Sequence, residues 1–402
     1  MAGLVTDQSI VVPDAMLEGN GVKVIHDEIV RVDSQEKKAF SKRGQEFSYD
    51  QLFLATGSSS FVPPLDGSDL SGVMTLRGLP DAVRIKNAIA ENTPQNIVFV
   101  GAGFISMEVA SLLAEQSSNT AKISIVELMD RPLPLMLDGD MAGQVAEYFQ
   151  EKGIALHLGE KVAKIQGLDG KVTGVVLDSG EVVDADMVFM NVGVRPNLEL
   201  AEQIGLELGQ FGIKVNSFQE PSMPGILAGG DCVEKYHFIT KKAVPGQLRG
   251  PAVVQGRLAA KRLAGYEIPF PGVLDAGGCK IFDMTVTATG LTEESAKNEG
   301  FETVSAIVDS RSKHGMIPGM KPWRLKLVFD KATTKLIGGQ IVSQTVGPAR
   351  EIDAISAFIL GEKTISELTT FTSACNPDIS SEPSAEPITI AAEQALQKIK
   401  TM

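Results

Sequence analysis

The chain of 402 residues is predicted to have an α/β fold, and three features of the sequence predict it. A strand, a glycine turn, a helix and a second strand follow one another between residues 96 and 127. A β-rich stretch precedes this unit, and from about residue 272 strands and helices alternate. The length is sufficient for two or three domains with buried cores.

The part before residue 96 is expected to be mainly β-structure followed by one helix. Apolar runs bounded by turn residues predict short strands at 22–25, 29–32, 47–49 and 52–55. Gly19-Asn20-Gly21 predicts a hairpin turn before the first strand, and a charged hairpin is expected at 35–38. Pro63-Pro64 and Gly67 indicate a linker, and Pro80-Asp81 opens a helix predicted over 80–92.

Residues 96–127 have the layout of a dinucleotide-binding unit. The apolar run 96–100 leads into Gly101-Ala102-Gly103. Gly101 allows a tight turn, and Gly103 lets a pyrophosphate approach the positive end of the following helix. Ser106 replaces the third glycine of the usual pattern, and so small a residue should be tolerated there. We therefore favour a nucleotide site over a plain strand–turn–helix segment.

Glu127 ends the second strand, where an acidic residue binds the ribose in such units. Its carboxylate would accept hydrogen bonds from the ribose hydroxyls and repel a 2′-phosphate, which favours NADH over NADPH. Arg131 weakens this preference, because a guanidinium could pair with that phosphate. The sequence therefore predicts NADH, with NADPH as the alternative.

The remaining elements are predicted from apolar periodicity and turn residues. In chain order they are a helix at 139–152, a meander at 161–192 with turns at 169–170 and 179–180, a strand and loop at 225–231, a helix at 251–263, strands at 284–288, 303–308, 325–329 and 336–343, and helices at 293–299 and 348–359. Pro269 and Pro271 mark a boundary before the last group.

Composition excludes several classes of protein. A net charge of −13 argues against nucleic acid or an anionic membrane as the main partner. Three widely spaced cysteines and four scattered histidines argue against a disulfide framework or a metal site, and a reducing cytoplasm is the expected location. Apolar runs stay well below the roughly 18 residues of a membrane span.

Four matches, the last of them made of three segments, together resemble the pyridine nucleotide–disulfide oxidoreductases, which are FAD enzymes that take hydride from NAD(P)H. The similarity is greatest to the branch of coenzyme A-disulfide reductases and NADH oxidases. Ala55-Thr56-Gly57 resembles the turn where the chain leaves the flavin domain, and Gly193–Asn197 resembles the segment that closes the NAD domain. Leu227–Asp231 resembles the second flavin motif. Segments at 282–286, 290–293 and 317–319 resemble the interface domain.

The resemblance implies two Rossmann-like nucleotide-binding domains and a C-terminal α+β dimerisation domain. The FAD domain would comprise residues 1–77 and 196–268, the NAD(P)H domain 78–195 and the dimerisation domain 269–402. A homodimer through the last domain is expected. The implied cofactor-binding residues are Ala55, Thr56, Gly57, Gly230 and Asp231 for FAD, and Gly101, Gly103, Phe104, Ile105, Ser106, Glu108, Glu127 and Gly193 for NAD(P)H.

One part of the family pattern has no counterpart here. The family begins with a strand–GxGxxG–helix–strand unit that holds the ADP half of FAD, and the sequence starts after that point. The flavin domain is therefore expected to be incomplete, with an unpaired sheet edge and without a helix N-terminus for the FAD pyrophosphate. We expect Met1 to be a truncated or misassigned start, in preference to a second chain that supplies the unit.

The cysteines have different expected roles. Cys375 lies in a segment that resembles the one reaching the partner subunit's flavin, and it is the candidate catalytic thiol, with an inert packed thiol as the alternative. Asn376 stands where one branch of the family has a histidine, so that acid–base role is expected to be lost. Cys232 and Cys279 are expected to be buried fillers.

The function expected from the resemblance is that of an FAD-dependent NAD(P)H oxidoreductase. Its acceptor would be a disulfide, a CoA-disulfide, a polysulfide, oxygen or a small redox protein. The alternative is a flavin-free, catalytically silent module that binds NADH or dimerises.

Overall fold

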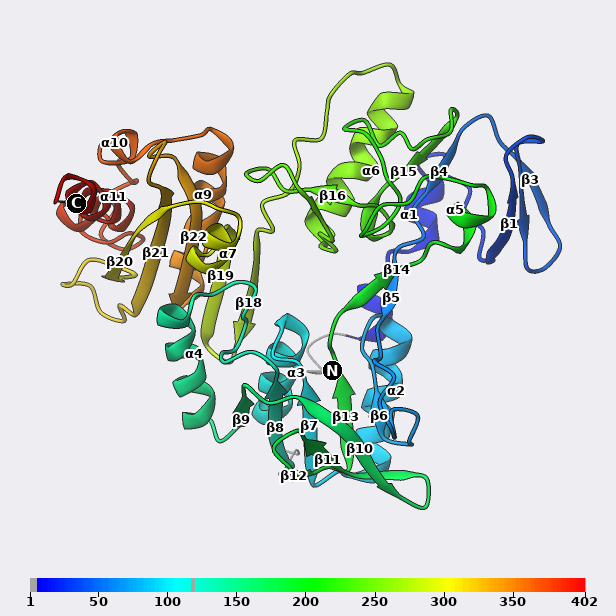
Figure 1. Cartoon of the computed structure of the whole chain (residues 1–402), viewed down its shortest axis with the longest axis horizontal. Coiled ribbons are helices and arrows are strands. Elements are labelled where there is room, and N and C mark those ends of the chain that lie inside the picture. The colour runs from blue at the N-terminus through cyan, green and yellow to red at the C-terminus, as the bar shows by residue number, and fades with distance from the viewer. Residues whose placement is uncertain (1–5, 117–119, 402) are drawn as a thin grey trace. The chain divides into compact units, whose positions relative to one another are not determined.

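The computed structural model describes residues 6–116 and 120–401, and the chain divides into two compact units (Figure 1). We call residues 61–193 with 274–402 the large unit, and the described part of 2–60 with 194–273 the small unit. The predicted α/β fold is confirmed. The predicted division into three domains stays a prediction, because the proposed NAD(P)H and dimerisation parts fall within the same unit.

A five-stranded parallel sheet forms one part of the large unit, with the strand order β6-β13-β7-β8-β9. Its strands are β6 (Val73–Met74), β13 (Met187–Met190), β7 (Asn96–Val100), β8 (Lys122–Glu127) and β9 (Ala155–Leu158). The crossover helices are α2 (Leu79–Asn92), α3 (Phe104–Glu115) and α4 (Gly139–Glu151). This is the topology expected for residues 96–127, whereas β9 had not been predicted.

Alternation along β7 sends apolar side chains to both faces of this sheet, as buried parallel strands require. Ile97 and Phe99 pack in one core with α3 and α4, and the Phe99 ring stacks on Phe189 with centroids 4.6 Å apart. Val98 and Val100 face the antiparallel meander on the other side. The meander consists of β10 (Val162–Leu168), β11 (Lys171–Leu177) and β12 (Val182–Asp184). Both of its predicted turns are confirmed.

A five-stranded antiparallel sheet, of order β18-β19-β22-β21-β20, forms the rest of the large unit. Its strands are β18 (Gly277–Ile281), β19 (Met284–Gly290), β20 (Thr303–Arg311), β21 (Pro322–Asp330) and β22 (Leu336–Ser343). Its helices are α7 (Glu293–Asn298), α8 (Val346–Ala349), α9 (Glu351–Leu360), α10 (Ile365–Leu368) and α11 (Pro387–Thr401), with a 3-10 turn at Pro383–Ala385. The sequence had not predicted α11, which packs on β20 and β21.

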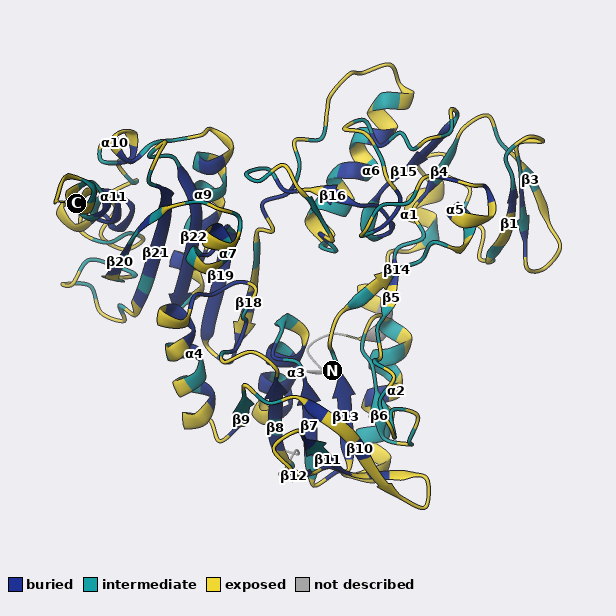
Figure 2. Ribbon diagram, in the orientation of Figure 1, coloured by how far each residue is buried: buried dark blue, intermediate teal, exposed yellow. Residues whose placement is uncertain are grey.

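The two sheets of the large unit share one hydrophobic core. Ile281, Met284 and Val286 of the antiparallel sheet belong to the same buried cluster as Phe99 and Met107. Figure 2 shows β7, β8 and β13 buried, as it does β19, β21 and β22. The parallel sheet and α3 are therefore covered in part by residues far along the chain.

The small unit contains short sheets and three helices. Its strands are β1 (Ile29–Asp33), β2 (Lys38–Ser41), β3 (Glu46–Ser48), β4 (Leu52–Leu54), β5 (Ser58–Ser60), β14 (Val194–Pro196), β15 (Ile226–Ala228), β16 (Lys235–Tyr236) and β17 (Ala243–Val244). Its helices are α1 (Asp14–Glu18), α5 (Glu199–Gln203) and α6 (Arg249–Leu263), with 3-10 turns at Asp7–Ile10 and Gly230–Cys232. Strands β1–β3 form an antiparallel sheet, and β4 pairs in parallel with β15.

The prediction of a strand at residues 22–25 is wrong. Gly19–Gly21 form the turn that ends α1, not a hairpin, and the next regular element begins at Ile29. Val22 and Ile25 are exposed by 50% and 41%. Their apolar spacing had suggested a strand, but there is no pairing partner among the described residues to complete one.

A buried lysine joins α4 to the antiparallel sheet. The Lys326 side chain is only 1% exposed, and its Nζ lies 3.1 Å from Asp138, 2.8 Å from Asp140 and 2.5 Å from Glu293. Burial alone would lower the pKa of Lys326, but these carboxylates raise it above its usual value. Burial would likewise raise the pKa of Asp138, yet hydrogen bonds from Gln340 and the Glu293 amide, together with Lys326, lower it. Lys326 and Asp138 are therefore both charged at neutral pH.

Replacing this lysine should strongly destabilise the protein. Lys326→Met leaves clustered carboxylates without their buried cation, so we expect the free energy of unfolding to fall by about 3–5 kcal/mol in urea denaturation at neutral pH. Because the folded-state pKa of Asp138 is depressed, its contribution is present at neutral pH and is lost as the pH falls through that pKa. The difference between variant and wild type should therefore shrink in acid. Lys331→Met, which removes an exposed partner of Glu302, is the matched control and should change little.

Candidate functional site

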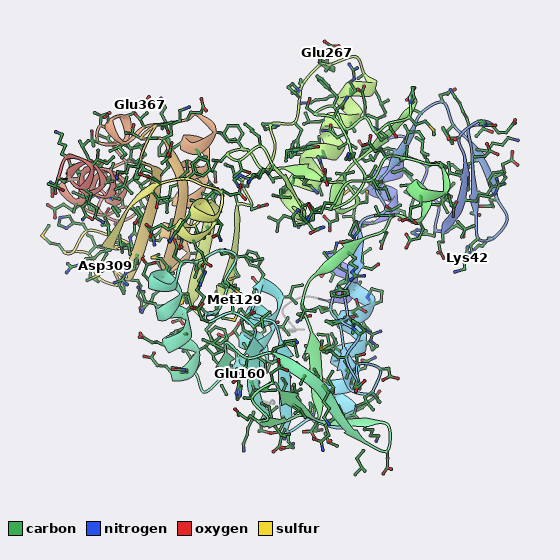
Figure 3. The ribbon with its side chains drawn as sticks, viewed as in Figure 1. Lys42, Met129, Glu160, Glu267, Asp309 and Glu367 are labelled. Carbon is green, nitrogen blue, oxygen red and sulfur yellow. The ribbon has the colours of Figure 1, made fainter. Side chains whose placement is uncertain are left out.

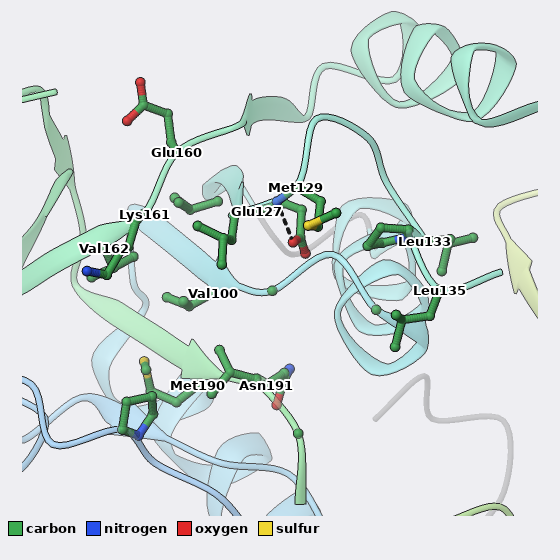
Figure 4. Close-up of a pocket in the computed structure, with 18 of the residues that line it drawn as sticks. Val100, Glu127, Met129, Leu133, Leu135, Glu160, Lys161, Val162, Met190 and Asn191 are labelled. Carbon is green, nitrogen blue, oxygen red and sulfur yellow. Dashed lines mark hydrogen bonds between the residues drawn. The ribbon is translucent and has the colours of Figure 1, made fainter. Parts of the chain in front are cut away.

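A cavity of about 550 Å³ opens at the carboxyl ends of the parallel strands (Figure 4). Val100, Glu127 and Met190, which stand at the ends of β7, β8 and β13, line it. This is the edge at which open α/β sheets bind their ligands. The other lining residues are Pro63, Leu65, Gly101, Gly103, Phe104, Val126, Leu128, Met129, Leu133, Pro134, Leu135, Met136, Glu160, Lys161, Val162, Asn191, Val192 and Gly193.

The glycine turn between β7 and α3 forms the floor of this cavity. Gly101 has φ +92°, and a Cβ there would lie 2.7 Å from the carbonyl oxygen of Asn191, so other residues would be both strained and obstructed. Gly103 is the N-cap of α3, and a Cβ at this position would meet no atom within 4 Å. The amides at the start of α3 have no partners within the helix, and the open space at Gly103 leaves room for a phosphate to approach them.

Glu127 connects the glycine turn to the loop after β8. Its carboxylate is buried and accepts a hydrogen bond from the amide of Ala102 at 2.6 Å and from the amide of Met129 at 2.9 Å. Figure 4 shows this carboxylate at the cavity with its bond to Met129. Each oxygen retains a second lone pair. Glu127 can therefore brace the turn and also accept a hydrogen bond from a ribose hydroxyl.

Arg131 does not line the cavity, although the sequence had suggested that it could meet a 2′-phosphate. Its side chain is 12% exposed, and it donates from Nε to the Leu137 carbonyl at 2.9 Å and from Nη1 to Asp130 at 2.8 Å. Nη2 is paired with Glu294 of α7. The guanidinium is thus engaged by groups outside the cavity.

The other residues predicted from the sequence around α3 are divided between the cavity and the interior. Phe104 lines the cavity, and its ring stands so close to β18 that a Cβ on Gly277 would lie 2.9 Å from it. Ser106 is buried and accepts a hydrogen bond from the Asn191 amide group at 3.2 Å, so it fills the place of the third glycine. Ile105 is 37% exposed and does not line the cavity.

Glu108 faces β18 and is absent from the lining of the cavity. It is partly buried and accepts a hydrogen bond from the Lys280 amide at 3.2 Å. Burial raises its pKa, and the Lys280 amide offsets part of that rise. The structure thus places Glu108 at the contact of α3 with the antiparallel sheet.

Sequence reasoning missed several lining residues, including Asn191, Glu160 and Lys161. Met129 and Glu160, which come from the loops after β8 and β9, are labelled in Figure 3. Each of these residues follows a parallel strand, and strand ends are where such sheets bind their ligands. This rule could have indicated Asn191 and Met129 from the predicted segments, but not Glu160 and Lys161, because β9 had not been predicted.

The residues implied for FAD lie together in the small unit. Leu54 and Ala228 pair at the ends of the parallel strands β4 and β15, and the turns that follow hold Thr56, Gly57, Gly230 and Asp231. Thr56 donates to the carbonyl of Asn197 at 2.8 Å, and the Asn197 side chain donates back to the Thr56 carbonyl at 2.8 Å. The Ala55–Gly57 turn is therefore fixed to the Gly193–Asn197 segment, as the family pattern implies.

Asp231 and two glycines make these turns compatible with a flavin nucleotide. Asp231 accepts a hydrogen bond from Ser58 at 2.9 Å through one carboxylate oxygen. Gly57 and Gly230 have φ +69° and +81°, and a Cβ on Gly57 would meet no atom within 4 Å, while one on Gly230 would meet only Ala252 at 3.8 Å. A carboxylate beside open glycine turns suits the hydroxyl-rich ribityl chain of FAD.

The three cysteines are free thiols in different surroundings. Cys232 and Cys279 are buried, as predicted, and burial raises the pKa of Cys279. Cys375 is exposed on the loop before α11, has φ +55°, and donates from Sγ to the Ser373 carbonyl at 3.1 Å. It is absent from the lining of the cavity, and its catalytic role stays a prediction.

Residues 6–116 and 120–401 contain neither a metal-binding cluster nor a helix that could span a membrane. They contain no group of three or more histidine, cysteine or acidic side chains placed to hold a metal ion. They also contain no helix of the length and apolar character needed to cross a membrane.

Comparison with known proteins identifies relatives over most of the chain. Residues 6–252 match the family model described as pyridine nucleotide-disulphide oxidoreductase, and residues 277–386 match the dimerisation domain of that family. The match starts at residue 6, and these comparisons do not confirm the expected absence of the first flavin-domain unit. An NADH oxidase of Methanocaldococcus jannaschii is 37% identical over 375 residues, which cover 92% of this chain and 82% of that protein.

Further relatives carry names that refer to sulfur. A CoA-dependent NAD(P)H sulfur oxidoreductase of Pyrococcus abyssi is 33% identical over 355 residues, covering 88% of this chain and 78% of that protein. Among solved structures, the NAD-dependent persulfide reductase from A. fulgidus has a TM-score of 0.87 and 33% identity, covering 92% of this chain and 68% of that one. The reduced CoADR-RHD of Bacillus anthracis has a TM-score of 0.92 and 28% identity, covering 100% and 72%.

The two glycines of the turn provide a matched test of the cavity. Gly101→Ala should lower the free energy of unfolding by about 1–3 kcal/mol, because of its positive φ and the contact with Asn191. Gly103→Ala has an allowed φ of −80° and no steric obstacle, so it should retain wild-type stability. Its methyl group would nevertheless stand over the helix amides and raise the Kd for NADH by about tenfold in titration calorimetry. Wild-type affinity in Gly103→Ala would show that the phosphates bind elsewhere.

Proposed function

The chain belongs to the pyridine nucleotide-disulphide oxidoreductase family, and we propose that it takes hydride from NADH and passes the electrons through FAD to a small sulfur compound. Members of this family are oxidoreductases that use FAD and NAD(P)H. One observation supports the first step above all others: the cavity at the strand ends joins an open helix N-terminus at Gly103 to the carboxylate of Glu127.

We assign the NADH-binding roles to residues of this cavity. The amides at the start of α3 would hold the pyrophosphate, and Glu127 would accept from the adenosine ribose while its bonds to Ala102 and Met129 fix its position. Leu128, Met129 and Leu135 form apolar walls suited to the adenine. Phe104 and Gly193 line the cavity beyond the turn, where the ring can orient the nicotinamide.

FAD, when bound, would accept the hydride and release two electrons to the acceptor. We assign its recognition to the small unit. Asp231, held by Ser58, would accept from the ribityl hydroxyls, and Gly57 and Gly230 would allow close approach of the cofactor. The boundaries of an FAD domain at 1–77 and 196–268, of an NAD(P)H domain at 78–195 and of a dimerisation domain at 269–402 remain part of this proposal.

NADH is the proposed donor in preference to NADPH. The buried carboxylate of Glu127 lies where a 2′-phosphate would bring further negative charge, and Arg131 is engaged outside the cavity.

We also propose a homodimer through the antiparallel sheet and its helices, since residues 277–386 match the family's dimerisation domain. The three free thiols support a reducing compartment such as the cytoplasm.

Anaerobic titration tests the proposed hydride step. Purified protein should show the visible absorption of bound flavin, and NADH should bleach it at lower concentration than NADPH does. A colourless protein that binds NADH in calorimetry would contradict the flavin assignment and favour the silent module. The absence of binding by either nucleotide would contradict the proposed function altogether.

Steady-state assays identify the acceptor. The names of the relatives support sulfur, a polysulfide or a persulfide as the acceptor. Molecular oxygen is the competing acceptor, because other relatives are named NADH oxidases. We expect anaerobic NADH oxidation with polysulfide to be faster than oxygen consumption in air, with release of sulfide or thiol.

Cys375→Ser should slow only the turnover with the sulfur acceptor and leave the bleaching by NADH unchanged. An unaffected turnover would show that Cys375 is not catalytic.

A further inference from the structure

One wall of the nucleotide cavity is a loop that the antiparallel sheet holds in place. The loop runs from Leu128 to Leu137, and Leu128, Met129 and Leu133–Met136 line the cavity. In the sequence, Arg131 lies between the two stretches of this loop that line the cavity, yet Arg131 itself is not a lining residue. Since both neighbouring stretches face the cavity, the direction of this side chain decides whether its guanidinium joins Lys161 among the positive charges at the cavity.

Three groups outside the cavity engage the guanidinium at once. Within the loop itself, Leu137 accepts from Nε at 2.9 Å and Asp130 accepts from Nη1 at 2.8 Å. The contact that comes from elsewhere in the fold is Glu294, which pairs with Nη2. With Glu294 in place, only 12% of the arginine side chain is exposed.

The position of Glu294 is itself fixed by buried groups. Asp138 accepts hydrogen bonds from the amides of Glu293 and Glu294 at 3.1 and 3.3 Å. Asp138 is held in turn by the Gln340 side chain at 2.6 Å and by the ammonium of Lys326. The first turn of α7 is thus anchored at the end of the loop whose arginine it binds.

We propose that Glu294 determines the preference for NADH, by drawing the positive charge of Arg131 away from the adenosine end of the cavity. This inference rests on the proposed function. Without Glu294, the guanidinium can turn toward the cavity, where a 2′-phosphate would be its strongest partner because phosphate and guanidinium form paired, charge-assisted hydrogen bonds. Glu127 is unchanged by this movement, so binding of NADH itself should be little affected.

The test compares four proteins: wild type, Glu294→Gln, Arg131→Met and the double variant. The Kd for NADH and for NADPH is measured by calorimetry and kcat and KM by steady-state assay. Glu294→Gln should lower the Kd and KM for NADPH by about tenfold, the size of one charge-assisted hydrogen bond, with little change in kcat or in NADH binding. The double variant should lose this gain. Glu302→Gln, which changes an exposed carboxylate between α7 and β20, is the control and should behave as wild type.

Each outcome has a separate meaning. If wild-type protein binds neither nucleotide, the proposed function fails. If it prefers NADH but Glu294→Gln leaves the NADPH constants unchanged, or if the gain persists without Arg131, the inference about Glu294 is overturned alone. Should Glu294→Gln unfold, Glu294→Ala is measured in the same way. Loss of folding in both would overturn the inference, because Glu294 would then be structural.

Discussion

The carboxylate of Glu127 is the contact on which the nucleotide cavity depends. It accepts hydrogen bonds from the amides of Ala102 and Met129, so a single side chain binds the glycine turn to the loop that forms the opposite wall. Two amides that would otherwise be buried without partners are satisfied in this way. The residue that recognises the ribose in our proposal is thus also the brace of the site. Changes at this position would alter the shape of the cavity together with its selectivity.

A second level of support comes from the antiparallel sheet. The core that covers Phe99 and Met107 includes Ile281 and Met284, and the Phe104 ring is confined by β18 at Gly277. The ion cluster around Lys326 joins the end of the cavity loop to α7 and β21. These contacts unite the nucleotide-binding and interface parts of the sequence in one unit. The geometry of the proposed hydride site therefore depends on residues that no local motif identifies.

The sequence predicted correctly those elements that are determined by their own local residues and do not depend on a distant partner. The strand, glycine turn, helix and strand of 96–127 follow from backbone requirements, and Glu127 follows from its place at a strand end. The strand predicted at 22–25 was wrong because apolar spacing carries no information about whether a partner strand is available. The direction of Arg131 could not be predicted either, since its partner Glu294 is distant in the chain. Lys161 was missed because β9 had not been predicted, and Asn191 because only the tertiary structure brings it beside Gly101.

The order of the segments has a consequence for how the protein is made. The parallel sheet is complete once Met190 has been synthesised, but the core that covers one of its faces includes Val342. By that time α3 and α4 already cover this face, but the apolar side chains that pack against β18, β19 and β22 still lack their partners. At a synthesis rate of about 5–20 residues per second, this surface stays exposed for roughly 8–30 s. During this interval the ribosome also produces residues 194–273, which belong to the small unit. Because apolar surface exposed in this way is prone to aggregation, the order of the segments makes this surface the one that chaperones would need to protect during synthesis.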